Sequence, residues 1–128
     1  MSAAAHLLST SLLRADTIAA GGFVQPGPLS HEDVQAYSAS LDTAVSSAGE
    51  IYKGAVEADS PSSARIEALV GDIQRDLPVY AALNERARVN QRMGNPVGVA
   101  YMSEASAIMR TRMLVAASEI NELTRADV

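Results

Sequence analysis

A repeat of apolar residues at intervals of three and four runs through the second quarter of the sequence. The repeat extends over more than three heptads and consists of Val34, Tyr37, Leu41, Ala44, Ala48, Ile51, Ala55 and Ala58. An α-helix has 3.6 residues per turn, so residues at this spacing share one helix face, whereas a strand would need strict alternation. Small residues in the repeat allow a neighbouring helix to approach closely. The pattern predicts a long helix that packs at a shallow angle within a bundle.

The composition also favours helices over strands. Hydrophobic residues make up 48% of the 128 residues, yet the chain has one Phe, four Tyr and no Trp. A core of Ala, Leu, Ile, Val and Met suits close-packed helices, because strands favour β-branched and aromatic residues. A chain of this length fits one ordinary domain. We therefore expect a single helical domain over residues 1–128.

Glycines and prolines mark the ends of the predicted helices. The first helix is expected over about residues 3–20, and Gly21-Gly22 is expected to end it. Two prolines follow within residues 21–29, which predicts the one substantial loop of the chain. Ser30, followed three residues later by Asp33, resembles a capping box and predicts the start of the second helix.

Residues 59–61 predict a very short turn between the second and third helices. Ser60 is expected to be the N-cap of the third helix, with Pro61 at its first position, where the missing N–H costs nothing. The apolar rhythm of the third helix continues on both sides of Pro78. We therefore expect Pro78 to kink this helix and not to end it.

Residues 94–96 carry the strongest turn signal. Gly94 suits the left-handed position after a helix, Asn95 is a favoured N-cap, and Pro96 suits the first helical position. The fourth helix is expected to run from Pro96 towards the C-terminus. One of its faces carries three methionines, Met102, Met109 and Met113. Core packing is their simpler interpretation, and an adaptable partner-binding stripe is the alternative.

Short connections force consecutive helices to run in opposite directions. The expected fold class is all-α, an antiparallel up-down-up-down four-helix bundle with both termini at one end. No run approaches the roughly 18 consecutive apolar residues of a membrane-spanning helix. The first helix is shorter than the others, and neither terminus carries a stop signal. We expect this domain to be excised from between two transmembrane helices of a longer protein.

Several classes of function lack the residues they need. The net charge of −5 argues against nucleic-acid binding, which requires clustered positive charge. Absent cysteines exclude thiolate metal sites and cysteine nucleophiles. His6 and His31 have no ligand-spaced partners, and Glu32-Asp33 is better explained by the helix macrodipole than by acid–base catalysis. We expect no enzyme activity, no catalytic residues, no metal and no cofactor.

The end of the third helix is the candidate binding site. Asn84 and Arg88 lie on adjoining turns of one face, while Asn90, Arg92 and Asn95 extend a set of hydrogen-bond donors towards the next turn. Free N–H groups at the start of the fourth helix would add partial positive charge, which predicts a carboxylate or another anion as ligand. The simpler alternative is a solvated face on which Glu85 pairs with Arg88.

Arg14 and Asp16 flank the apolar face of the first helix. Surface or inter-helix polar contacts are their simpler interpretation, and Arg14 remains a further binding candidate.

Three stretches carry a family resemblance. LRADTIAAGGF (residues 13–23), PVYAALNERARVNQ (78–91) and GNPVGVAYMSEAS (94–106) resemble the extracytoplasmic helical domain of sensor-type actinobacterial membrane proteins. Some proteins of that group look like the transmembrane link between a glutamine-type solute-binding lipoprotein and a cytoplasmic serine/threonine protein kinase. The resemblance implies a domain on the extracytoplasmic face of the cell membrane, anchored by flanking helices that this chain lacks. It supplies no ligand and no binding residues.

Two functional classes follow, besides a purely structural spacer. One is a sensory or partner-binding domain that relays the occupancy of a solute-binding protein, or of a small anionic ligand such as an amino acid, to the cytoplasm. The alternative is a small secreted helical interaction protein. For the sensor we expect recognition at the end of the bundle that holds the loop of residues 21–30 and the turn of residues 94–96. The sequence leaves the oligomeric state open, a homodimer included.

Overall fold

The chain folds into four long helices. The computed structural model describes residues 2–24 and 29–126 and places no strand among them. The helices are α1 (Ser2–Val24), α2 (His31–Ala58), α3 (Ser63–Arg92), and a fourth that comprises α4 (Val97–Ile108), a π-helical segment η1 (Met109–Met113) and α5 (Leu114–Ala126). The predicted all-α class is confirmed.

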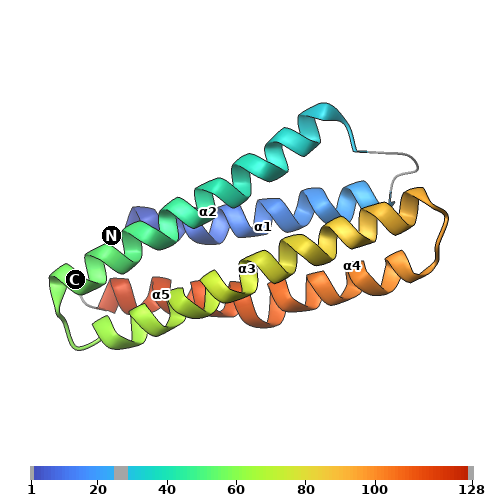
Figure 1. The fold of residues 1–128 in the computed structure, drawn as a ribbon. Helices are drawn as coiled ribbons and strands as arrows, with labels where there is room; N and C mark the ends of the chain where they lie inside the picture. Colours follow the sequence, from blue (N-terminus) through green and yellow to red (C-terminus); the bar gives the residue numbers. More distant parts are fainter. Residues whose placement is uncertain (1, 25–28, 127–128) are drawn as a thin grey trace.

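The helices lie side by side along one long axis. In Figure 1 each helix leads back along the one before it, so both termini lie at the end that holds the α2–α3 turn. We call this the terminal end, and the opposite end, with the α3–α4 turn, the apical end. α1 packs against α2 and α5, and α3 packs against α2 and the fourth helix. These contacts are compatible with the predicted up-down-up-down order.

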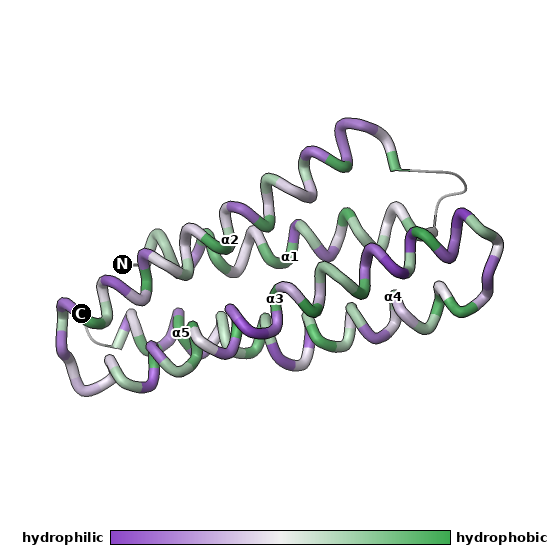
Figure 2. The backbone as a smooth tube through the Cα atoms, in the orientation of Figure 1, coloured by the Kyte–Doolittle hydropathy of each residue, from purple (hydrophilic) through white to green (hydrophobic). Residues whose placement is uncertain are grey.

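The core changes character along this axis. Figure 2 shows hydrophobic and hydrophilic residues alternating along every helix, as expected for helices that bury one face. Large aliphatic side chains fill the terminal half of the core, among them Leu8, Leu12, Ile51, Ile66, Leu69, Val70, Ile73, Met113 and Ile120. The apical half also buries aliphatic residues such as Leu83, but it differs in holding two buried tyrosines, Tyr37 and Tyr80, and the buried Asp16 and Asn84. The apical half therefore contains the larger buried polar side chains.

The predicted end of the first helix is wrong. α1 continues through both glycines to Val24, because glycine weakens a helix without forcing it to stop. Gly22 has a packing role, since a side chain at this position would overlap Leu29. The rest of the predicted loop includes residues 25–28, which lie outside the described residues.

The start of α2 is confirmed, and its apolar repeat is confirmed except at its ends. Ser30 Oγ accepts a hydrogen bond from the Asp33 backbone N–H at 3.0 Å, as the capping signal predicted. Tyr37, Ala44, Ala48, Ile51 and Ala55 are buried and Leu41 is partly buried, whereas Val34 and Ala58 are exposed. The first residues of α2 diverge from the bundle in Figure 1. Val34, in this first turn, is 47% exposed.

The α2–α3 turn is longer than predicted. Asp59 takes a left-handed conformation with φ 45°, and α3 begins at Ser63 with Ser62 as its N-cap, so Ser60 is not the cap. The hydroxyl of Ser63 closes the turn, since it donates to the Ala55 carbonyl oxygen at 2.7 Å and accepts from the Ser60 backbone N–H at 2.8 Å. α3 then continues through Pro78, as predicted.

The turn of residues 94–96 follows the sequence signal closely. Gly94 has φ +71°, the left-handed conformation that favours glycine. α4 begins at Val97, one residue later than predicted, so Pro96 and not Asn95 is its N-cap. Asn95 Oδ1 still accepts from the Val97 backbone N–H at 3.2 Å. Met102, Met109 and Met113 are buried, which favours the core interpretation over the partner-binding stripe.

Candidate functional site

A cluster of polar side chains crosses the core in its apical half. We call Asp16, Tyr37, Tyr80 and Asn84 the polar cluster. The Tyr80 hydroxyl donates to Asp16 Oδ1 at 2.9 Å, which joins α3 to α1, and Asn84 Nδ2 donates to the Tyr37 hydroxyl at 2.9 Å, which joins α3 to α2. Ser106 of α4 also hydrogen-bonds Asp16. All four helices therefore contribute to one buried network.

The cluster is not fully satisfied. Tyr80 and Asn84 are completely buried, yet Asn84 Oδ1 has no hydrogen-bond partner within the described part of the chain. A buried acceptor left in this state costs about 1–3 kcal/mol of folding stability. Asp16 is only 7% exposed, and none of the ion pairs formed by the described residues involves it. The apical core thus contains groups that favour water over their present surroundings.

Burial sets the protonation behaviour of the cluster. Burial raises the pKa of the Asp16 carboxyl, and the Tyr80 hydrogen bond, the charge of Arg110 and the Ser106 hydrogen bond oppose it in that order. Burial also raises the pKa of Tyr37 and, far more strongly, that of Tyr80. Both tyrosines therefore remain protonated at neutral pH and act as neutral hydrogen-bonding groups.

Arg88 is held against the cluster and is not freely exposed. Its guanidinium lies 5.2 Å from the centre of the Tyr37 ring, in a cation–π contact. It also pairs with Glu85 Oε2 at 3.1 Å, which is the pairing that the solvated-face alternative predicted. The side chain is 21% exposed. Arg88 is thus engaged within the chain and is poorly placed as an anchor for an external ligand.

The other predicted residues cap the α3–α4 turn. Asn90 Nδ2 donates to the Arg86 carbonyl oxygen at 2.8 Å, and Asn95 Nδ2 donates to Asn90 Oδ1 at 3.0 Å. These hydrogen bonds connect the end of α3 to the segment before α4, so both asparagines stabilise the turn.

The predicted free N–H groups at the start of α4 already have acceptors. The N–H groups of Val97, Gly98 and Val99 are bonded to Asn95 Oδ1, the Asn95 carbonyl oxygen and the Pro96 carbonyl oxygen. The expectation of free donors here was wrong, because the short Asn95-Pro96 segment folds back onto the first turn. The anion site loses this part of its support.

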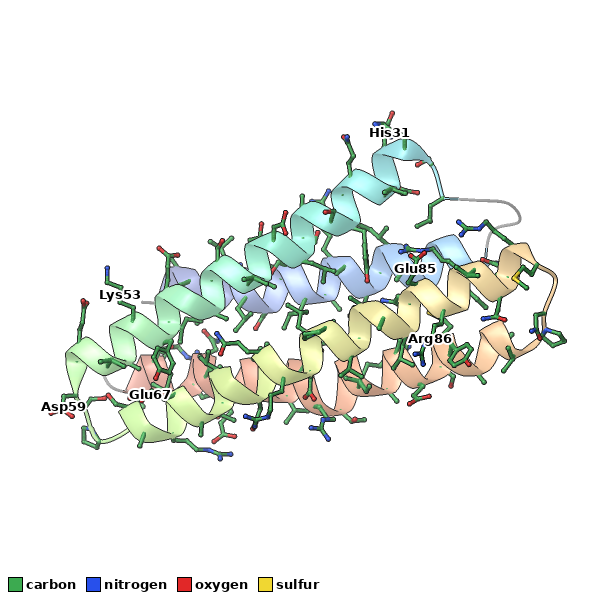
Figure 3. All side chains as sticks on the ribbon, in the orientation of Figure 1. His31, Lys53, Asp59, Glu67, Glu85 and Arg86 are labelled. Carbon is green, nitrogen blue, oxygen red and sulfur yellow. The ribbon has the colours of Figure 1, made fainter. Side chains whose placement is uncertain are left out.

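Two arginines remain available at the apical end. Arg86 and Arg92 are exposed, and no ion pair in the described ranges 2–24 and 29–126 includes either one. In Figure 3 Arg86 lies in the apical half of α3, far from Asp59 at the terminal end. Met93 is 71% and Val99 61% exposed around the same turn. Positive charge and apolar surface thus occur together at this end.

The remaining candidate, Arg14, lies apart from the others. It is exposed on α1 and borders a shallow hollow with Ser40 and Thr43 of α2. It takes part in none of the ion pairs found among the described residues. The structure therefore joins Asn84 and Arg88 through Tyr37, joins Asn90 to Asn95, and leaves Arg14 and Arg92 separate.

The inter-helix interpretation of Asp16 is confirmed by its hydrogen bond with Tyr80, but the sequence did not indicate the polar roles of Tyr37 and Tyr80. Tyr37 belongs to the apolar repeat of the second helix, and Tyr80 lies two residues after Pro78 in the apolar rhythm of the third. Both are buried, but their hydroxyls need polar partners. Asp16 directly follows the buried Ala15. A carboxylate beside an apolar face, together with two tyrosines on facing helices, was the available signal for a buried network.

A sizeable cavity lies away from the polar cluster. It has a volume of about 560 Å³ at the terminal end and is lined mainly by small and apolar residues of α1, α2 and α3, with Glu50 and Thr124 as polar neighbours. The described residues contain no group of His, Cys, Asp or Glu suited to a metal ion. None of the described helices is long and apolar enough to cross a membrane.

Comparison with known proteins gives one match. A family described as the actinobacterial sensor domain matches residues 1–128, the full length of the chain. No curated protein and no solved structure matches it.

Proposed function

Because the chain belongs to the actinobacterial sensor domain family, we propose that it is the extracytoplasmic sensory domain of a membrane signalling protein. It detects a small solute or a solute-binding protein and relays that occupancy to the cytoplasm. The family match over the whole chain carries this proposal. The helical fold supports it, since long packed helices can pass a small shift from one end to the other.

The apical end is the surface best suited to recognition. Arg86 and Arg92 offer uncompensated positive charge, which fits a carboxylate or an acidic patch on a partner protein. Exposed Met93 and Val99 add apolar contact area of the kind found in protein interfaces. A solute-binding protein with carboxylates around an apolar patch would complement this end.

The domain acts by binding and not by chemistry. The carboxylate of Asp16 and the hydroxyls of Tyr37 and Tyr80 are engaged with one another inside the core, away from any substrate. A catalytic site would need such groups in an accessible cleft. The described residues offer no nucleophile paired with a base in such a cleft.

Location in the cell tests the proposal directly. The chain has no cysteine, so Ser46→Cys on the exposed face of α2 creates a single labelling site within this domain. In the full-length protein, we expect a membrane-impermeant maleimide to label Cys at this position in intact cells. The unsubstituted domain is the control. Labelling that requires cell lysis would contradict an extracytoplasmic position.

Fractionation separates the sensor from a secreted interaction protein. We expect the full-length protein to stay in the membrane fraction after a carbonate wash, which removes peripheral proteins. Recovery of the domain in the culture medium as a native product would favour the secreted alternative.

A further inference from the structure

The four helices group into two hairpins. α1 packs most extensively against α2, and α3 packs most extensively against α4. Ion pairs reinforce the second hairpin from within: Arg65 binds Glu119 through two hydrogen bonds of 2.7 and 2.9 Å, and Arg112 binds Asp76 at 3.0 Å. Each hairpin is therefore held together by its own contacts.

The contacts between the hairpins differ between the two ends. In the apical half they include the Asp16–Tyr80 and Asn84–Tyr37 hydrogen bonds, the Arg88 contact with the Tyr37 ring, and a hydrogen bond from Gln91 to the Phe23 carbonyl oxygen. In the terminal half the buried residues are mostly aliphatic. Side-chain polar bonds thus join the hairpins through the apical half, whereas apolar packing joins them through the terminal half, apart from the Ser63–Ala55 bond at the connecting turn.

We propose that the apical half of this interface is a latch, so that the α1–α2 hairpin and the α3–fourth-helix hairpin part and close as rigid bodies about their apolar terminal half. Polar groups that separate regain hydrogen bonds to water, so their separation is much less costly than that of an apolar interface. Asn84 Oδ1 gains most from water, because it has no hydrogen-bond partner among the described residues, and the Asp16 carboxylate, which is 7% exposed, regains hydration of its charge.

The positions of the chain ends give this movement a consequence. α1 begins at the terminal end in one hairpin, and α5 ends there in the other (Figure 1). Opening at the apical end therefore changes the angle between the two hairpins at the chain ends, while their separation at the terminal end stays nearly constant. The latch rests on the proposed sensory function for its purpose, but its existence is a physical property of the purified chain.

Two variants should move the latch in opposite directions. Tyr80→Phe removes the hydroxyl that donates to Asp16 and leaves a buried carboxylate without that bond, so the open form should gain population. The double variant Tyr37→Phe with Asn84→Leu replaces both partners of one bond, and the unsatisfied oxygen, by apolar groups. The interface of this double variant is apolar at those positions, so the variant should favour the closed form.

Pairs of spin labels report the movement, because the cysteine-free chain accepts labels only where cysteines are introduced. The inter-hairpin apical pair is Ser38→Cys with Ser103→Cys, and the inter-hairpin terminal pair is Glu57→Cys with Ser118→Cys. A third pair, Thr17→Cys with Ser38→Cys, lies within the first hairpin. All five positions are exposed.

We expect Tyr80→Phe to lengthen and broaden the 38–103 distance distribution and to leave the 57–118 and 17–38 distributions unchanged. The double variant should narrow the 38–103 distribution. An unchanged 38–103 distance in Tyr80→Phe, or an equal change in all three pairs, would overturn the latch. These distances are measured on the purified domain and do not depend on its cellular location or its ligand. They can therefore refute the latch while the proposed function stands, and the labelling experiment in cells can refute the proposed function while the latch stands.

Discussion

Asp16 shows how one side chain can specify the arrangement of a core and also reduce its stability. Its carboxylate accepts the Tyr80 hydrogen bond and so fixes α1 against α3, but its charge remains in surroundings that disfavour it. Such a group selects one helix arrangement while it lowers the stability of that arrangement. This combination suits an element that must change state.

Asp16 should make stability depend on pH with an unusual sign. Its folded-state pKa is raised by burial, so over the range from its usual value of 3.8 up to the raised value the folded chain binds more protons than the unfolded chain. The contribution of Asp16 to stability therefore falls as pH rises through this range. We expect Asp16→Asn to unfold at higher urea concentration than the parent at pH 7, with an advantage that shrinks towards pH 4.

The control for this measurement is Asp42→Asn, which removes a carboxylate from an exposed position of α2. It should change stability little at either pH. If Asp16→Asn were the less stable protein at pH 7, the carboxylate would be a net stabilising group and the argument from burial would be wrong.

The fourth helix shows how an element can adapt its geometry to its sequence. Ala105, Met109, Met113 and Ala117 are all completely buried, yet they are spaced by four residues each. In a regular α-helix each step of four advances the side chain by about 40°, so three steps would carry Ala117 about 120° away from Ala105. The π-helical segment absorbs this drift, and the Leu114 backbone N–H accordingly bonds to the Met109 carbonyl oxygen five residues earlier.

Deletion of Thr111 should convert this helix to a continuous α-helix without loss of its core. Thr111 is exposed within η1, and its removal changes the spacing of the buried residues from four-four-four to four-three-four. We expect the melting temperature to stay within about 4 °C of the parent, which corresponds to roughly 1 kcal/mol in a domain of this size.

Deletion of Ser118, an exposed residue of α5, is the matched control. It changes the spacing from Ala117 to Ile120 from three to two and turns Ile120 away from the core, at a cost of about 1.5–3 kcal/mol for that side chain alone. Circular dichroism melts of the two deletions compare them directly. Equal destabilisation by both would mean that η1 is not the site of the extra residue.

The sequence predicted elements well where the signal was local, and poorly where it depended on neighbouring helices. The Ser30 cap and the left-handed Gly94 are set by a few adjacent residues, and both were predicted. The continuation of α1 past Gly21-Gly22, and the packing of Leu29 close to Gly22, have no local sequence signal. The hydrogen bonds of the polar cluster span 47 and 64 residues and required the tertiary fold.

At the scale of the whole molecule the two ends have different tasks. The terminal end has an aliphatic core and the chain ends, whereas the apical end has the polar cluster, the capped α3–α4 turn and two arginines outside the ion pairs of the described residues. Arg86 and Arg92 both belong to α3, so a ligand bound to them is held by the α3–fourth-helix hairpin. Selective contact with one hairpin is how a ligand could favour one relative position of the two.

The double variant Arg86→Ala with Arg92→Ala tests where recognition occurs. Exposed arginines contribute at most about 1 kcal/mol each to stability, so the helical content and the melting temperature should change little. A charge-assisted hydrogen bond is worth about 1.5–3 kcal/mol, so losing one from each arginine should weaken a carboxylate-bearing ligand or an acidic partner by about 100-fold or more. Thermal shift with the standard amino acids measures binding of small carboxylate-bearing ligands. Co-elution with the solute-binding lipoproteins of the same cell measures binding of acidic partner proteins.

The matched control is Arg75→Ala with Arg125→Ala, which removes the same charge from exposed positions nearer the terminal end. It should leave both kinds of binding unchanged, because long-range attraction alone is screened within about 10 Å at moderate salt. If both double variants weakened binding equally, the loss of affinity would be explained by net charge and not by the position of the arginines. Binding lost only in the control would place recognition at the terminal end, next to the 560 Å³ cavity, and would reverse the assignment of tasks to the two ends.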